Sequence, residues 1–144
     1  MSTVLASYGV VEVVRRALLD NSDVSALVAD RVLGAYPEQA DASEATFPVV
    51  VLLQRGGSMR RFARLEDLSL DVVCLSQASP GAAAALYDAV TAVLQIERLT
   101  FSDAAAAGSE RVAVCEEVAR PGSIRDEGLR AWAFSGRWLA RALW

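Results

Sequence analysis

The sequence predicts an α+β fold in which two helices pack on one face of a mainly antiparallel sheet of four to five strands. Three observations support this fold class. The stretch Leu65–Glu97 contains an alternating strand followed by an amphipathic helix, Phe47–Gln54 is an uninterrupted apolar run, and Glu110–Leu143 alternates twice more. With 53% hydrophobic residues, residues 1–144 are expected to form a single α+β domain with one core.

The strand and the helix of Leu65–Glu97 are the best defined elements. The strand has a two-residue period, so one face is expected to be buried, and that face consists of Leu68, Leu70, Val72 and Cys74. In the helix, apolar residues recur every three or four positions between Ala83 and Leu94. The opposite side carries Asp88, Thr91 and Gln95. Ser79 is the expected N-cap and Pro80 the first helical residue.

The segments before this pair predict short helices and a buried strand. The expected elements are a helix at Tyr8–Leu19, one further helical turn at Asp23–Val28, a short strand at Arg31–Leu33 and a loop at Gly34–Thr46. Ser22 or Asp23 is expected to cap the helical turn at Asp23–Val28. Phe47–Gln54 lacks alternation, which is typical of a strand that is buried on both faces.

The rest of the chain is expected to complete the sheet. Arg55–Arg64, with its glycine pair Gly56–Gly57, is predicted to be a turn or extended loop that joins two strands into an antiparallel hairpin. The remaining predicted elements are a loop at Arg98–Gly108, a strand at Glu110–Arg120, a turn at Pro121–Glu127 and a strand at Gly128–Leu143.

Composition and charge argue against several classes of protein. A net charge of −4 and a pI near 4.8 disfavour a dedicated nucleic-acid binder, because such domains carry a basic surface. No apolar run approaches the roughly 18 residues that cross a bilayer. The N-terminal stretch has no basic region before its apolar residues, so we expect a helix rather than a signal peptide, and the cytoplasm of the producing cell. Cys74 and Cys115 are expected to be reduced core residues, with a disulfide as the less favoured alternative.

No catalytic, metal or cofactor site is expected from the residue chemistry. The chain has no histidine, which removes the commonest general base and the usual zinc ligand. The glycine pair is not followed by a Lys–Ser/Thr pair, so it is not a phosphate loop. Glu116 and Glu117 are adjacent in a strand and point to opposite faces. The loop acids near Glu38, Asp41 and Glu44 lack the spacing of a calcium loop and are expected to be solvated.

Two features suggest a protein interface. The arginines Arg55, Arg60, Arg61 and Arg64 form a basic cluster in an acidic protein, which is either a solvated hairpin loop or a contact for a protein or a polyanion. The second feature is the aromatic set Trp132, Phe134, Trp138 and Trp144. These aromatics either pack in the core or anchor a partner subunit. We take Arg55, Arg60, Arg61, Arg64, Trp138 and Trp144 as the candidate interface residues.

The order of elements resembles the tail-terminator (tail-completion) proteins of long-tailed bacteriophages. The residues that carry the resemblance are Ala26–Val32, the Phe47–Pro48 entry to an apolar strand, and the helix Leu86–Leu94, within residues 8–97. The long last strand with its tryptophans departs from the family pattern. The resemblance implies a non-enzymatic virion protein without a cofactor, placed in the tail or neck of the particle and in the host cytoplasm before assembly.

The resemblance also implies partners. Such a protein forms a homo-hexameric ring on the head-proximal end of the tail tube, stops tube elongation and joins the tail to the neck. Its partners are its own copies, the tail tube protein and the neck or head-completion proteins, and DNA only passes through the lumen. Because an acidic lumen lets DNA slide, we expect the arginine cluster at a protein interface. The alternatives are another ring protein of the neck or head–tail joint, and a cytoplasmic dimeric ligand-binding module.

Overall fold

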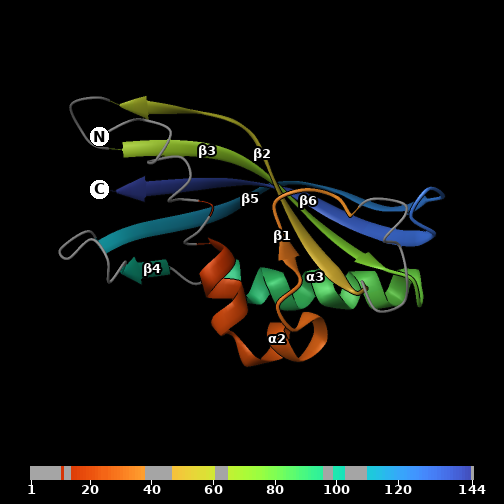
Figure 1. Ribbon diagram of the computed structural model, residues 1–144. Helices are drawn as coiled ribbons and strands as arrows, with labels where there is room; N and C mark the ends of the chain where they lie inside the picture. The colour runs from red at the N-terminus through yellow and green to blue at the C-terminus, as the bar shows by residue number, and fades with distance from the viewer. Residues whose placement is uncertain are drawn as a thin grey trace.

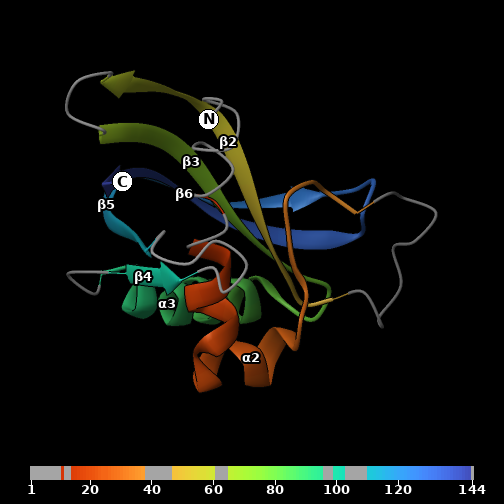
Figure 2. The same cartoon turned by 60° about the vertical axis from the view of Figure 1, so that its left-hand side comes forward.

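The computed structural model describes residues 11, 14–37, 47–60, 65–95, 99–102 and 110–143. In this part of the chain, three helices accompany one six-stranded sheet with the strand order β1-β2-β3-β6-β5-β4 (Figures 1 and 2). Neighbouring strands are antiparallel except β1 and β2, which are parallel. The strands are β1 Val32–Leu33, β2 Val49–Arg60, β3 Leu65–Ser76, β4 Leu99–Ser102, β5 Glu110–Asp126 and β6 Ala131–Leu143. The predicted α+β class is confirmed.

The helices lie together on one side of the sheet (Figure 1). Residues 14–20 form the described part of the first helix, followed by α2 (Ser22–Val28) and α3 (Pro80–Leu94). The N-cap of α3 is Ser79, whose hydroxyl accepts a hydrogen bond from the Ala82 amide at 3.0 Å, as predicted. The cap of α2 is Asn21, not Ser22 or Asp23, because the Asn21 side chain accepts from two amides of the first turn.

Because side chains alternate between the two faces along each strand, the apolar residues of the sheet form two clusters, one on each face. We call the face of the sheet under α3 the covered face, and the opposite one the outer face. On the covered face, the predicted side of β3 packs against the predicted stripe of α3; its members are Leu68, Leu70, Val72 and Cys74 with Ala83, Leu86, Tyr87, Val90, Val93 and Leu94. On the outer face, a smaller cluster contains Phe47, Val49, Val51, Val73, Leu75, Leu129, Ala131 and Ala133. Residues 49–52 are buried, so β2 contributes to both clusters, as its uninterrupted apolar run predicted.

Both cysteines are buried and free. Burial raises the pKa of the Cys74 thiol above its usual range and raises that of Cys115 to about 12. The prediction of two reduced core cysteines is therefore confirmed.

The sheet is longer than predicted at three places. Residues 55–60 continue β2 rather than forming a turn, because a bulge at Gly56, where φ is 127°, absorbs the irregularity while pairing with β3 continues. Similarly, the predicted turn at Pro121–Glu127 is wrong. There β5 runs on past Pro121 through two register shifts, and the turn follows at residues 127–130. The predicted loop at Arg98–Gly108 contains β4, which pairs with the start of β5.

One helix residue also departs from the prediction. Thr91 was assigned to the exposed side of α3, but its side chain is buried, and its hydroxyl lacks a hydrogen-bond partner among the described residues. Because α2 also packs against α3, more of the α3 surface is covered than its predicted apolar stripe. The predicted loop acids Glu38, Asp41 and Glu44 lie outside the described residues.

Candidate assembly surface

Three of the six candidate interface residues, Arg55, Arg60 and Trp138, lie within the described part of the chain. Arg55 lies on β2 with its side chain about half exposed, and Arg60 is the last residue of that strand. Arg61, Arg64 and Trp144 lie outside the described residues. Trp138 lies on β6 and is only 1% exposed, so it belongs to the core rather than to an interface.

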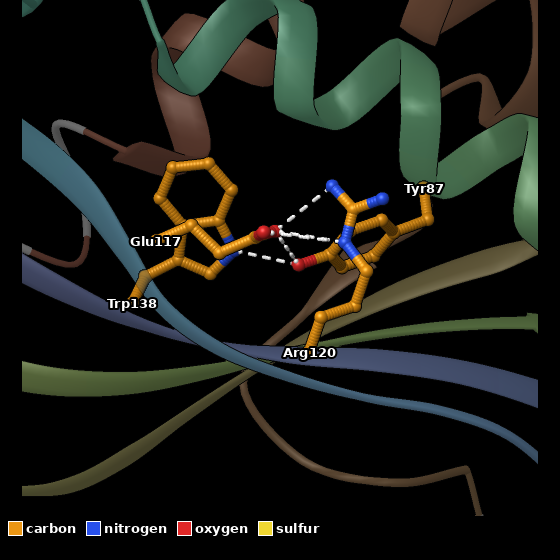
Figure 3. A network of polar contacts seen from close by, with 4 residues as sticks. All are labelled: Tyr87, Glu117, Arg120 and Trp138. Atoms are coloured by element: carbon orange, nitrogen blue, oxygen red, sulfur yellow. Dashed lines mark hydrogen bonds and ion pairs between the residues drawn. The ribbon is translucent and has the colours of Figure 1, made fainter.

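Trp138 belongs to a polar network under α3 (Figure 3). Its indole N–H donates to the hydroxyl oxygen of Tyr87 at 3.1 Å, and that hydroxyl donates to Glu117 Oε2 at 2.5 Å. Arg120 closes the network by donating to both carboxylate oxygens of Glu117, and its guanidinium lies 5.0 Å from the centre of the Tyr87 ring. Each buried polar group of this network therefore has a partner.

The geometry around Tyr87 requires a glycine on the facing strand. A Cβ atom at Gly136 would overlap the Tyr87 hydroxyl, so only glycine lets the ring lie flat on β6. Phe134, two residues before Gly136 on the same face of β6, also packs against the ring, with 5.0 Å between centroids. Burial, followed by the hydrogen bond to Glu117, raises the pKa of Tyr87 to about 12. The sequence alone does not reveal this network, because its residues belong to α3, β5 and β6, and no local spacing pattern links these three elements.

The network has the chemistry of a structural cluster. Tyr87 keeps its proton at neutral pH, and Glu117 is occupied by Tyr87 and Arg120. No group of three or more His, Cys, Asp or Glu residues that could hold a metal occurs among the residues that the structure describes. Within the same residues, no helix is long and apolar enough to cross a membrane.

The outer face carries a different polar feature, a ladder of cross-strand ion pairs that we call the outer-face ladder. Asp71 on β3 accepts from the Nε groups of Arg55 on β2 at 2.7 Å and of Arg137 on β6 at 3.2 Å. One pleat further along, Arg141 donates to Asp67 at 2.7 Å. The residues of both β3–β6 pairs are directly opposite one another in the register. Asp71 is thus shared by two arginines. A second carboxylate, Asp126, also lies close by, since burial and then the charge of Asp126 raise the pKa of the neighbouring Tyr36.

A groove of about 290 Å³ lies beside these ion pairs, and we call it the outer-face groove. Its lining combines apolar side chains with Arg55, Asp71 and Arg137 of the ladder. The lining residues are Tyr36, Arg55, Asp71, Val73, Ala119, Ile124, Ala133, Ser135, Gly136 and Arg137. Ile124 is 66% exposed, an unusual position for a large apolar side chain without a partner. Among the predicted interface residues that the structure describes, Arg55 lines this groove.

Comparisons with known proteins bear on the fold. No family model matches the chain, and no curated protein matches it. Among solved structures, it is similar to a chain described as "Virion of native gene transfer agent (GTA) particle", with a TM-score of 0.62 and 14% sequence identity. The similarity covers 90% of this chain and 90% of that one. The whole arrangement of helices and sheet described above is therefore a fold that a chain of a virion particle also has.

Proposed function

We propose that this chain is a non-enzymatic structural protein of a phage-like particle, and that within the particle it acts as a tail terminator. The observation that carries the proposal is the shared fold with a chain of a gene transfer agent virion over 90% of both chains. The resemblance of Ala26–Val32, Phe47–Pro48 and Leu86–Leu94 to tail-terminator proteins supports the finer assignment.

The chemistry of the described residues agrees with a role in assembly. The buried polar network is satisfied internally, whereas the outer face offers exposed arginines, an apolar groove and the side chain of Ile124. Surfaces of this kind, with arginine beside exposed apolar groups, are typical of protein contacts. We propose that copies of the chain associate into a six-membered ring on the head-proximal end of the tail tube and bind neck proteins on the other side.

Charge is compatible with DNA passing through such a ring. The chain has a net charge of −4, so a ring of six copies carries a strongly negative total charge that does not retain DNA phosphates. We therefore propose protein contacts, rather than DNA contacts, for Arg55, Arg60, Arg61 and Arg64.

Electron microscopy with mass determination tests the proposal directly. The purified protein at high concentration is imaged by negative stain, and the mass of the same sample is measured by light scattering. Rings of about six subunits with a central hole are expected, and adding them to purified tail tubes should stop tube elongation. A uniform closed dimer without a hole, inactive on tubes, would instead favour a ligand-binding module.

A genetic observation separates the terminator from other ring proteins of the neck. Particles that lack a tail terminator should carry tails of uncontrolled length, whereas particles that lack a head–tail joining protein should release tails of normal length. Tail length in a deletion strain, measured by microscopy, therefore decides between the two assembly roles.

A further inference from the structure

We propose that copies of this chain contact one another head to tail, with helix α2 of one copy placing its exposed Leu27 side chain in the outer-face groove of the next. The inference rests on the proposed ring assembly and names the two surfaces that would form it. It follows from two exposed features that lie in different layers of the domain.

The first feature is an exposed stripe on α2. Val24 and Val28 point into the core, which leaves the other side of the helix in solvent. That side carries Asp23, Ala26 and Leu27, and Asp30 follows two residues after the end of the helix; all four are exposed. Leu27 is 45% exposed and lies one helical turn after Asp23, so the two side chains share a side of the helix. We call these four residues the α2 stripe; it combines an apolar side chain with two carboxylates.

The second feature is the outer-face groove, whose chemistry is complementary to the stripe. Val73, Ala119, Ala133 and Ile124 offer an apolar lining for a side chain such as Leu27. Arg55 and Arg137 line the groove and share the single carboxylate of Asp71. Within the part of the chain that the structure describes, both arginines bond through Nε alone. Their terminal nitrogens can therefore bind a carboxylate in a charge-assisted contact.

The geometry prevents one chain from making this contact with itself. Helix α2 lies with α3 in the helix layer (Figures 1 and 2), whereas the groove is lined by outer-face residues such as Val73 and Ala133, on the other side of the sheet. Two different surfaces on one chain that fit each other form a heterologous contact, and repeating such a contact closes a ring when the rotation allows. An amphipathic helix in an apolar groove is also a recurring mode of protein recognition.

Two variants that each block one surface test the contact. Leu27→Arg places a positive charge opposite Arg55 and Arg137, and Ala119→Trp fills the groove from an exposed position of β5. Each variant is expected to keep the thermal stability of the wild type and to weaken self-association about tenfold or more, measured by analytical ultracentrifugation. The matched controls are Ala85→Arg on the exposed side of α3 and Val118→Trp, one residue before the groove position, and both should associate like the wild type.

Mixing the two blocked variants gives the decisive result. Leu27→Arg retains an intact groove and Ala119→Trp an intact α2 stripe, so the mixture should form a 1:1 pair with one contact that cannot grow further. The inference is overturned if the mixture stays monomeric, if either blocked variant associates normally, if the controls lose association equally, or if the wild type stays monomeric at the highest concentration.

These outcomes are distinct from those of the proposed function. If wild-type rings cap tail tubes while both blocked variants still form rings, the terminator role stands and the α2–groove contact is wrong. If the mixed pair forms but the wild type neither forms holed rings nor caps tubes, the contact stands and the terminator role is wrong.

Discussion

The two faces of the sheet differ in how their polar side chains find partners. On the covered face, Tyr87 of α3 meets Trp138 and Glu117 of the sheet, and their hydrogen bonds share the Tyr87 hydroxyl. On the outer face, Asp67 and Asp71 pair with arginines that are more than half exposed. Water can replace a lost partner on the outer face but not on the covered face. The covered face therefore holds the fold together, and the outer face can vary its contacts and bind a partner.

The largest effect that this comparison predicts is for Gly136→Ala. The new Cβ would overlap the Tyr87 hydroxyl, so the ring or β6 must move, and we expect a loss of about 3 kcal/mol in the free energy of unfolding. Urea denaturation followed by tryptophan fluorescence measures it. Gly34→Ala is the control, because nothing lies near its Cβ position and the expected change is small. Equal stability of the two variants would show that the covered face is not tightly packed around Tyr87.

Removal of the Tyr87 hydroxyl should have the next largest effect. Tyr87→Phe leaves the Trp138 indole N–H and one bond of Glu117 without their partner, and we expect a loss of about 2 kcal/mol in stability. Tyr36→Phe is the matched control, since Tyr36 is 44% exposed and its hydroxyl can bond to water. The same denaturation experiment measures both variants. A loss as large in Tyr36→Phe would contradict the contrast between the faces.

Alkaline pH tests the same hydroxyl in the wild type. The folded-state pKa of Tyr87 is raised from 10.0 to about 12, so its contribution to stability is complete below pH 10 and is lost as the pH rises towards 12. At pH 11, we expect this residue to account for a loss of about 1.4 kcal/mol. The buried thiols of Cys74 and Cys115 also have raised pKa values and weaken the fold in the same range. The measurement is therefore the difference in pH dependence between wild type and Tyr87→Phe, and parallel curves would contradict the prediction.

The smallest effect is expected on the outer face. Arg137→Gln removes one of the two partners of Asp71, but Arg55 and water remain, so stability should change by no more than about 0.5 kcal/mol. Thermal unfolding at low and high salt measures this change. A loss comparable to that of Tyr87→Phe would mean that the outer-face ladder is part of the structural framework rather than an adaptable surface.

The sequence predicted most of the fold because its strongest signals are local. The period of β3, the stripe and cap of α3, and the uninterrupted apolar run of β2 each depend on residues close together in the chain. The prediction was wrong where residues typical of turns lie in strands that pair with distant segments of the chain. Gly56–Gly57 and Pro121–Gly122 are typical turn residues, yet β3 and β6 supply enough partners to keep both stretches in the sheet as irregular strands.

The candidate surface was less predictable than the fold. The arginine cluster at Arg55–Arg64 was visible as a run of like charges, but a run does not reveal that Asp71 and Arg137, far along the chain, complete the charge pattern around Arg55. Similarly, the period of β6 placed Trp138 on one face without deciding whether that face is covered. The position of α3 shows that this face is covered, because Tyr87 of α3 provides the hydrogen-bond partner for the buried indole of Trp138.

By itself, the sequence determined most of the helices and strands, the apolar sides of β3 and α3, and the absence of histidine as a possible site residue. These properties follow from residue type and spacing along a few turns or pleats. Only the tertiary structure decided that Tyr87, Glu117, Arg120 and Trp138 form one network, and that Arg55 and Arg137 meet Ile124 at one groove. The reason is strand order: β6 lies between β3 and β5, which brings together residues separated by up to about half of the chain.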